Sequence, residues 1–233
     1  NITGIDTRDE PLKILKKRGA IIKRYPSEID KEVDLILLMV INEKQCEEII
    51  FGEKGLHKII NKDRIIINCA TVTPKYAIEV SSRLDKLGIP YLDAPVSGGT
   101  TGARNGTLTV MASGSSYAID QSRTLLNVLS KNLYHLNEKP GAGSYMKVIN
   151  QLLCGINLVS TAEALALGKH CGLSQEIIYE VIKNSAGNSF IFEDRAPRMM
   201  KSGPDVASAV NIFVKDLSIV TKTAKDLNFP IKL

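Results

Sequence analysis

Short apolar runs alternate with helix-like segments over residues 1–140, and this alternation constrains the fold more than any other feature of the chain. Runs at residues 33–40, 64–70 and 89–96 are rich in Ile, Leu and Val and have the length of strands. Between the last two, Thr73 and Pro74 suit the N-cap and the first position of a helix that extends to residue 87. Strands that alternate with helices in this way favour a mainly parallel sheet covered on both faces. The sequence therefore predicts an α/β domain.

The pattern changes at residues 137–141, Asn-Glu-Lys-Pro-Gly. Beyond them the apolar residues recur at helical spacing, which predicts one long helix over residues 143–171. Further helices are expected at residues 175–184, 189–200 and 207–227. We therefore expect an α/β domain at residues 1–140 and an all-helical domain at residues 141–233, beginning with the long helix.

The composition is that of an ordinary globular protein. Of the 233 residues, 44% are hydrophobic, and the longest apolar run, residues 35–41, is far too short to span a bilayer. The net charge of +5 comes from dispersed lysines, which disfavours nucleic-acid binding. The 4 cysteines lack CxxC pairing and the 3 histidines are scattered, so we expect reduced, buried thiols and no metal site. These features predict a cytoplasmic protein with neither a membrane nor a nucleic-acid partner.

A loop of small residues follows the strand predicted at residues 89–96. Its sequence is Asp93-Ala94-Pro95-Val96-Ser97-Gly98-Gly99. Ser97 offers a hydroxyl, and Gly98 and Gly99 allow backbone N–H groups to approach a ligand without a Cβ in the way. This arrangement suits a small carboxylate or phosphate. On these residues alone, a plain turn after a strand explains the glycines equally well.

A second motif begins the helical part of the chain, Gly141-x-Gly143-x-x-x-Lys147-x-x-Asn150-Gln151. On a helix, four of its residues share one face: Gly143, Lys147, Asn150 and Gln151. Lys147 would supply a proton donor, Asn150 a hydrogen bond to a substrate hydroxyl, and Gly143 room for a ligand or a facing domain. A lysine partly desolvated in a cleft would have its pKa lowered toward the range useful for proton transfer. A lone lysine on an amphipathic helix is otherwise usually an ordinary solvated side chain.

Together the two motifs resemble the substrate-anchoring and catalytic segments of the β-hydroxyacid dehydrogenases, the family that includes 3-hydroxyisobutyrate dehydrogenase. The resemblance covers nearly the whole chain and implies a Rossmann-like domain followed by an all-helical domain. It also implies hydride transfer between NAD and the secondary alcohol of a short hydroxy acid. In that scheme Lys147 is catalytic. The substrate-binding residues it implies are Ser97, Gly98, Gly99 and Asn150.

The resemblance further implies which residues bind the cofactor. Asp6, at the end of a strand expected over residues 2–6, would accept hydrogen bonds from the adenosine ribose and favour NAD over NADP. Arg8 could instead receive the 2′-phosphate of NADP, and Asp6 could also be a simple turn residue. The other cofactor-binding residues that the resemblance implies are Met39, Val40, Thr71 and Lys215.

Two later segments favour one branch of this family. Residues 188–195 and the run Asn211-Ile212-Phe213-Val214-Lys215-Asp216-Leu217 most resemble the L-threonate dehydrogenase branch, which implies a four-carbon sugar acid as substrate. Relatives more often carry Asp where Asn211 stands, so 3-hydroxyisobutyrate and tartronate semialdehyde stay as alternative substrates. A non-catalytic nucleotide-binding scaffold is the alternative of another class. We also expect a homo-oligomer, either a dimer or a tetramer.

One feature typical of dinucleotide folds does not occur in this sequence. No strand and G-x-G-x-x-G loop precede Asp6, and Gly98-Gly99-x-x-Gly102 lies in the wrong context. The chain also stops at Leu233, where the family usually continues. The resemblance therefore predicts a chain truncated at both ends relative to its family.

Overall fold

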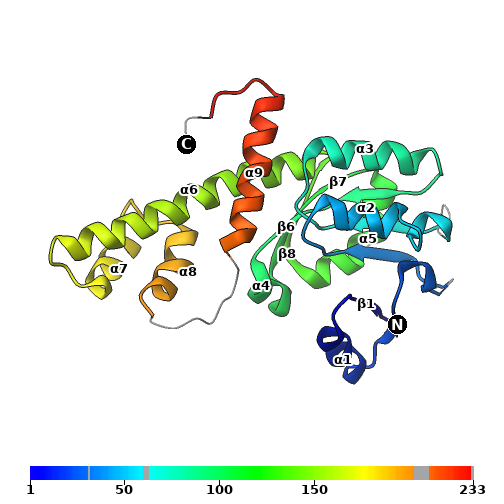
Figure 1. The fold of residues 1–233 in the computed structure, drawn as a ribbon, viewed down its shortest axis with the longest axis horizontal. Coiled ribbons are helices and arrows are strands. Elements are labelled where there is room, and N and C mark those ends of the chain that lie inside the picture. Colours follow the sequence, from blue (N-terminus) through cyan, green and yellow to red (C-terminus); the bar gives the residue numbers. More distant parts are fainter. Residues whose placement is uncertain (31, 60–62, 202–209, 232–233) are drawn as a thin grey trace. The chain divides into compact units, whose positions relative to one another are not determined.

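The computed structural model describes residues 1–30, 32–59, 63–201 and 210–231 (Figure 1). The chain forms two compact units, Asn1–Lys147 and Val148–Leu233. The first combines strands with helices, and the described residues of the second are helical or connect helices. The predicted fold class, a Rossmann-type sheet domain followed by helices, is confirmed. The division between the units falls inside a helix, so a domain boundary at residue 140 stays a prediction.

A six-stranded mixed sheet forms the centre of the first unit. Its strand order is β3-β4-β5-β7-β6, and β8 also pairs with β7. The pairs β3–β4, β4–β5 and β7–β8 are parallel, whereas β7 runs antiparallel to both β5 and β6. The strands are Leu35–Leu38 (β3), Ile65–Asn68 (β4), Tyr91–Asp93 (β5), Val96–Ser97 (β6), Leu108–Ser113 (β7) and Ser130–Asn137 (β8).

Helices cover both faces of this sheet because its central strands are apolar on both faces. Ile65 and Ile67 of β4 belong to a buried cluster with α5, whereas Ile66 belongs to a cluster with α2 and α3. Successive side chains of a strand point to opposite faces, so one fully buried strand contributes to two cores. The three helices are Glu43–Phe51 (α2), Pro74–Asp85 (α3) and Ser116–Leu129 (α5).

Side-chain caps determine where these helices begin. The Thr73 hydroxyl accepts the N–H of Tyr76 at 3.2 Å, and Pro74 occupies the first position of α3. Asn42 caps α2 in the same way, through the N–H of Gln45 at 3.0 Å. Each cap satisfies one of the N–H groups that a helix leaves without an internal partner. The helix start expected at Thr73 and Pro74 is thus confirmed.

A second, two-stranded parallel sheet lies at the N-terminus of the chain. It pairs β1 (Thr3–Ile5) with β2 (Ile21–Lys23), and α1 (Asp9–Lys17) connects them. The strand expected over residues 2–6 corresponds to β1, whereas the sequence did not predict β2. Nor did it predict α4 (Gly99–Asn105), which is rich in glycine and threonine and has little helical propensity. The described part of the unit also contains two short 3₁₀ helices, Pro26–Glu28 and Leu56–Lys58.

The second unit is built from α6 (Ala142–His170), α7 (Gln175–Lys183), α8 (Phe190–Met199) and α9 (Val210–Asp226). One apolar cluster joins Leu165 of α6 to Ile178 of α7 and Phe192 of α8. Another joins Val148 of α6 to Val220 of α9. The helices expected from the sequence are therefore present, and the first residues of the one expected over 207–227 lie outside the described residues.

The cysteines differ from the expectation of four buried thiols. All four are free, and Cys46 and Cys69 are buried, but Cys154 is half-buried and Cys171 is exposed. Cys171 follows the last residue of α6, where the helix ends in solvent. Burial raises the pKa of the Cys69 thiol to about 12, so this thiol stays protonated.

Within the described residues, α6 alone is long and apolar enough to cross a membrane. Its most apolar window has a mean hydropathy of 1.3, and 22% of that window is buried. Length and composition are weak evidence for a membrane span, because core helices of soluble proteins share them. Both Val148 and Leu165 of α6 belong to apolar clusters of the second unit. We therefore regard α6 as a helix of the protein's own packing.

Candidate active site

The Ser-Gly-Gly turn connects β6 to α4. Gly98 and Gly99 have φ angles of +125° and +60°, which favour glycine. A Cβ on Gly98 would also lie 3.1 Å from the Leu108 side chain. Ser97 is half-buried and both glycines are exposed. The turn therefore presents a hydroxyl and glycine backbone at the surface of the unit, as an anion-binding turn requires.

Met39, Val40 and Thr71 lie at one edge of the sheet. Met39 and Val40 directly follow β3, and Thr71 follows β4, whose Asn68 pairs with Leu38 of β3. Met39 is exposed, whereas Val40 and Thr71 are half-buried. Ligands of doubly wound sheets bind outside the carboxyl ends of the parallel strands. The structure thus brings together three of the predicted cofactor residues, at the edge where doubly wound sheets generally bind their ligands.

Glu43 ties the N-termini of α2 and α3 together at the same edge. Its Oε1 accepts the backbone N–H of Thr73 at 2.7 Å and the Thr73 hydroxyl at 2.5 Å. Thr73 therefore has a structural role. Because Glu43 lies in the first turn of α2, its charge also interacts favourably with that helix end.

Asp6 lies at the end of β1, in the two-stranded sheet. Its carboxylate accepts two hydrogen bonds from the Arg8 guanidinium, at 3.1 and 3.0 Å, and one from the Arg8 backbone N–H at 2.9 Å. These hydrogen bonds lower the pKa of Asp6 below its usual range. The carboxylate predicted to bind the ribose is therefore already paired with the residue that could bind a 2′-phosphate.

The first turn of α6 rests on the ends of β5 and β7. The N–H groups of Gly141 and Ser144 donate to Asp93 Oδ2 at 3.0 and 2.9 Å, and the Ser144 hydroxyl donates to Asp93 Oδ1 at 2.7 Å. A Cβ on Gly143 would lie 2.3 Å from the backbone oxygen of Met111 and 2.7 Å from that of Asp93. The expectation that Gly143 leaves room for a ligand or a facing domain is therefore wrong. Its bare Cα lets the helix contact the strands of its own unit.

Lys147 follows one turn later on α6 and is buried, with 7% of its surface exposed. Asn150 is half-buried, and its amide donates to Gln151 Oε1 at 2.9 Å and contacts Cys154 Sγ at 3.5 Å. In α-helical register Lys147 and Gln151 are i and i+4, and both are buried. The helical register expected from the motif is thus present.

A chain of polar contacts links Asn150 to Lys215 inside the second unit. Gln151 Nε2 donates to Asp216 Oδ2 at 2.5 Å, and Lys215 Nζ lies 2.7 Å from Asp216 Oδ1. Asp216 is only 4% exposed, and both of its carboxylate oxygens are contacted by these two side chains. Gln151 and Asp216 were not predicted as site residues. The i+4 spacing of Gln151 from Lys147 was the signal available, whereas the partnership with Asp216 depends on how α9 packs against α6.

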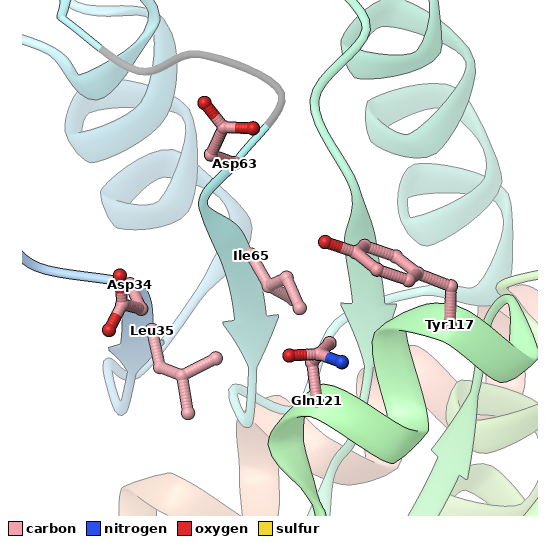
Figure 2. Close-up of a pocket in the computed structure, with 6 residues that line it drawn as sticks. All are labelled: Asp34, Leu35, Asp63, Ile65, Tyr117 and Gln121. Atoms are coloured by element: carbon pink, nitrogen blue, oxygen red, sulfur yellow. The ribbon is translucent and has the colours of Figure 1, made fainter.

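A pocket of about 210 Å³ lies at the amino ends of β3 and β4, opposite to the edge that carries Met39, Val40 and Thr71. It is lined by Asp34, Leu35, Asp63, Ile65, Tyr117 and Gln121, and Figure 2 shows the side chains of Tyr117 and Gln121 reaching into it from α5. Asp34 and Asp63 precede β3 and β4, so the pocket is at the amino ends of the strands. It is therefore separate from the predicted site. The described residues hold no group of three or more His, Cys, Asp or Glu side chains suited to a metal ion.

Comparisons with known proteins cover the entire chain. Residues 1–137 match the family described as the NAD binding domain of 6-phosphogluconate dehydrogenase. Residues 141–233 match the family described as the NAD-binding of NADP-dependent 3-hydroxyisobutyrate dehydrogenase. The chain is 39% identical to L-threonate dehydrogenase of Cupriavidus necator, over 100% of its own length and 78% of that protein.

Two further comparisons agree with these matches. The chain is 34% identical to 2-(hydroxymethyl)glutarate dehydrogenase of Eubacterium barkeri, over 86% of its length and 66% of that protein. The crystal structure of 3-hydroxyisobutyrate dehydrogenase from Salmonella typhimurium superposes with a TM-score of 0.91 at 36% identity, covering 99% of this chain and 81% of that one. The chain thus belongs to the NAD(P)-dependent β-hydroxyacid dehydrogenases, the family of 3-hydroxyisobutyrate dehydrogenase.

Proposed function

We propose that this protein catalyses the reversible oxidation of a secondary alcohol of L-threonate, with NAD as the hydride acceptor. The curated L-threonate dehydrogenases that match the chain, among them those of Cupriavidus necator and Escherichia coli at 39% and 36% identity, support this substrate. The observation that carries the catalytic assignment is the burial of Lys147. A lysine is almost never buried unless its charge has a purpose or a partner, so the reading of Lys147 as an ordinary solvated residue loses its support.

Three polar side chains of the two motifs, those of Lys147, Ser97 and Asn150, each have a role in this reaction. Lys147 takes the proton of the substrate hydroxyl during oxidation and returns it during reduction. Ser97, Gly98 and Gly99 hold the substrate carboxylate through the serine hydroxyl and the exposed glycine backbone. Asn150 orients the substrate hydroxyl. The hydride chemistry itself is supplied by the nicotinamide cofactor when it is bound.

The residues at the carboxyl edge of the sheet fit a nicotinamide dinucleotide. Met39 and Val40 offer apolar surface and backbone after β3, and Thr71 offers a hydroxyl after β4. Asp6 accepts the ribose hydroxyls and favours NAD over NADP. Lys215 provides a positive charge for the cofactor, and its contact with Asp216 at 2.7 Å keeps the ammonium in one place.

The closest rival substrate is 3-hydroxyisobutyrate. The Salmonella typhimurium protein of that name has a TM-score of 0.91 to this chain at 36% identity, which is as similar as several L-threonate dehydrogenases. Tartronate semialdehyde is the third candidate, because the anchoring and catalytic motifs do not distinguish between these substrates. A non-catalytic scaffold is disfavoured by the retention of the buried Lys147.

We also propose a homo-oligomer that acts in the cytoplasm. Several large apolar side chains on one stripe of α6 are exposed, which is unusual for a monomer. They are Met146, Ile149, Leu153 and Leu167, exposed by 39%, 53%, 57% and 65%. A second copy of the chain would cover them and form a dimer, or a tetramer when two dimers associate.

A substrate panel tests the proposal. The purified protein would be assayed with NAD and with NADP against L-threonate, its diastereomer L-erythronate, 3-hydroxyisobutyrate and glycerate, the reduction product of tartronate semialdehyde. We expect the highest kcat/KM for L-threonate with NAD. A higher value for 3-hydroxyisobutyrate or glycerate would move the assignment to that substrate. Cofactor binding without oxidation of any hydroxy acid would favour the scaffold.

A further inference from the structure

Asp93 is the last residue of β5 and is completely buried. Its carboxylate has four neighbours, all of them donors. They are the N–H groups of Gly141 and Ser144, the Ser144 hydroxyl and the Ser113 hydroxyl, at 3.0, 2.9, 2.7 and 3.2 Å. Neither the proposed proton transfer nor the proposed binding of cofactor and substrate uses Asp93.

These contacts replace the usual helix cap. The residue before α6 is Gly141, which has no side chain with which to cap the helix and has a φ angle of +111°. N–H groups at the start of α6 instead donate to side chains of the sheet. Asp93 accepts from Ser144 and from Gly141, the residue before the helix, and the Ser113 hydroxyl accepts from Gly143 at 2.9 Å. A carboxylate at a helix N-terminus also interacts favourably with the helix dipole. The first turn of α6 is thus capped by side chains of β5 and β7, which are distant in sequence, rather than by a residue next to the helix.

This cap fixes the helix in position as well as satisfying its N–H groups. Three N–H groups donate to two side chains, and Gly143 lies against the backbone of β5 and β7, so rotation or sliding of α6 at this end would break these contacts. Lys147 lies three residues after Ser144, which is about 4.5 Å along the helix axis. Asp93 also precedes Ser97 by four residues on the segment that carries the Ser-Gly-Gly turn. One buried carboxylate therefore connects the start of the lysine helix to the segment of the substrate-binding turn.

We propose that Asp93 is a positioning residue of the dehydrogenase reaction, which holds α6 so that Lys147 stands at a fixed place relative to the turn of Ser97, Gly98 and Gly99. This rests on the proposed function of Lys147 and of the turn. Asp93 touches neither substrate nor cofactor, and its effect passes through the backbone of α6. Its Oδ2 accepts the two N–H groups whether or not the carboxyl is protonated, so the proposal does not depend on its charge.

Two substitutions separate positioning from charge. Asp93→Asn keeps the shape and an acceptor oxygen for Gly141 and Ser144, and its NH₂ can donate to the Ser144 hydroxyl. Asp93→Ala removes the cap altogether. We expect kcat with L-threonate to fall about 10²-fold in Asp93→Ala, the scale of a small displacement of a catalytic group, while the Kd for NAD stays within about twofold. In Asp93→Asn kcat should recover to within about threefold of the unmodified protein.

Leu84→Ala is the matched control, because Leu84 is fully buried on α3 and takes no part in the hydrogen bonds of Asp93. It should lower Tm through the cavity it creates but leave kcat per folded molecule unchanged. If Asp93→Ala fails to fold, Ser113→Ala gives the same test in weaker form. Loss of the hydroxyl frees the Gly143 N–H, so amide exchange at residues 141–147 should quicken and kcat should fall by a few-fold.

Two results would overturn the proposal. One is a kcat of Asp93→Ala equal to that of the unmodified protein. An unchanged kcat of Ser113→Ala, in a variant whose amide exchange at residues 141–147 is faster, would count in the same way. The other is equal loss of kcat in Asp93→Asn and Asp93→Ala when both are folded. Failure of the proposed function would look different, because the unmodified protein would then oxidise none of the hydroxy acids, while amide exchange would still report whether Asp93 holds α6.

Discussion

Among single residues, Lys147 has the most direct experimental consequence. Lys147→Ala should reduce kcat with L-threonate by about 10²-fold or more, because a positioned acid–base group contributes on that scale. The Kd for NAD should change little, because no cofactor contact is assigned to this side chain. Steady-state kinetics and calorimetric titration measure the two quantities. Lys169→Ala is the control, because Lys169 is an exposed lysine in the last turn of the same helix. Near-normal turnover of Lys147→Ala would remove the catalytic assignment.

The Asp6–Arg8 pair leads to a prediction about the choice between NAD and NADP. The unmodified protein should have a higher kcat/KM with NAD than with NADP. Asp6→Ala releases the Arg8 guanidinium from two hydrogen bonds of 3.1 and 3.0 Å and removes the carboxylate that repels a 2′-phosphate. We therefore expect the ratio of kcat/KM values to shift toward NADP in Asp6→Ala and toward NAD in Arg8→Ala. A preference of the unmodified protein for NADP would show that Arg8 dominates.

The buried Asp93 carboxyl leads to a prediction about pH. Burial raises its pKa, and the hydrogen bonds from Ser144, Gly141 and Ser113 oppose that effect. The native state therefore binds this proton more tightly than the unfolded chain, whose aspartates titrate near about pH 3.9. The resulting stabilisation is complete below that pH and is lost as the pH rises through the native pKa. Asp93→Asn has no proton to lose, so its free energy of unfolding relative to the unmodified protein should rise between about pH 4 and 7. Urea unfolding across this range measures the difference, and a constant difference would contradict the argument.

Site residues whose geometry depends only on their sequence neighbours could be predicted from the sequence, and those that meet through tertiary packing could not. Ser97, Gly98 and Gly99 form a turn whose φ angles are a local property, so the glycine pair could be interpreted from the sequence. Lys147 and Asn150 could be placed on one helix from their spacing. Gln151 and Asp216 could not be paired in advance, because they lie on α6 and α9 and meet only through tertiary packing.

At the scale of elements, α6 contacts the sheet so closely at Gly143 that any side chain introduced there should destabilise the protein. Gly143→Ala would place a Cβ 2.3 Å from the Met111 backbone oxygen, which cannot move aside as a flexible side chain does. We expect a loss of about 2 kcal/mol in the free energy of unfolding. Gly187→Ala is the control, because its nearest neighbour would be the Ile182 side chain at 3.8 Å, and it should change stability by less than about 0.5 kcal/mol. Chemical denaturation of both variants measures these changes. Equal stabilities would mean that the helix does not rest on the strands.

The direction of β7 could not be predicted from the sequence. The alternation of strands and helices predicted a mainly parallel sheet, and β3, β4 and β5 are parallel. β7 is antiparallel to β5 because β6, the Ser-Gly-Gly turn and α4 reverse the chain between them. The apolar pattern of β7 does not encode that reversal, which takes place in the connection through α4, where Gly98, Gly99 and Gly106 have positive φ angles.

For the whole molecule, the exposed stripe of α6 predicts self-association. Multi-angle light scattering should give the mass of a dimer or a tetramer. Leu153→Lys should shift it toward the monomer, because Leu153 is 57% exposed in the single chain and would become buried in the oligomer. Val128→Lys is the control, since Val128 is 70% exposed but lies on α5. A monomeric unmodified protein would contradict the proposal.

The start of α6 is capped by residues of the sheet that are distant in sequence, and this affects how the protein can be recombined with its relatives. Family members with different substrates invite chimeras that exchange their helical parts, and the start of α6 looks like a natural junction. Its first turn, however, depends on Asp93 and Ser113, which come from the sheet. A crossover at residue 141 would join a helix start to a sheet that evolved for a different one. Crossovers placed after Lys147 keep the cap and its helix from one parent, so chimeras with that junction should fold more often.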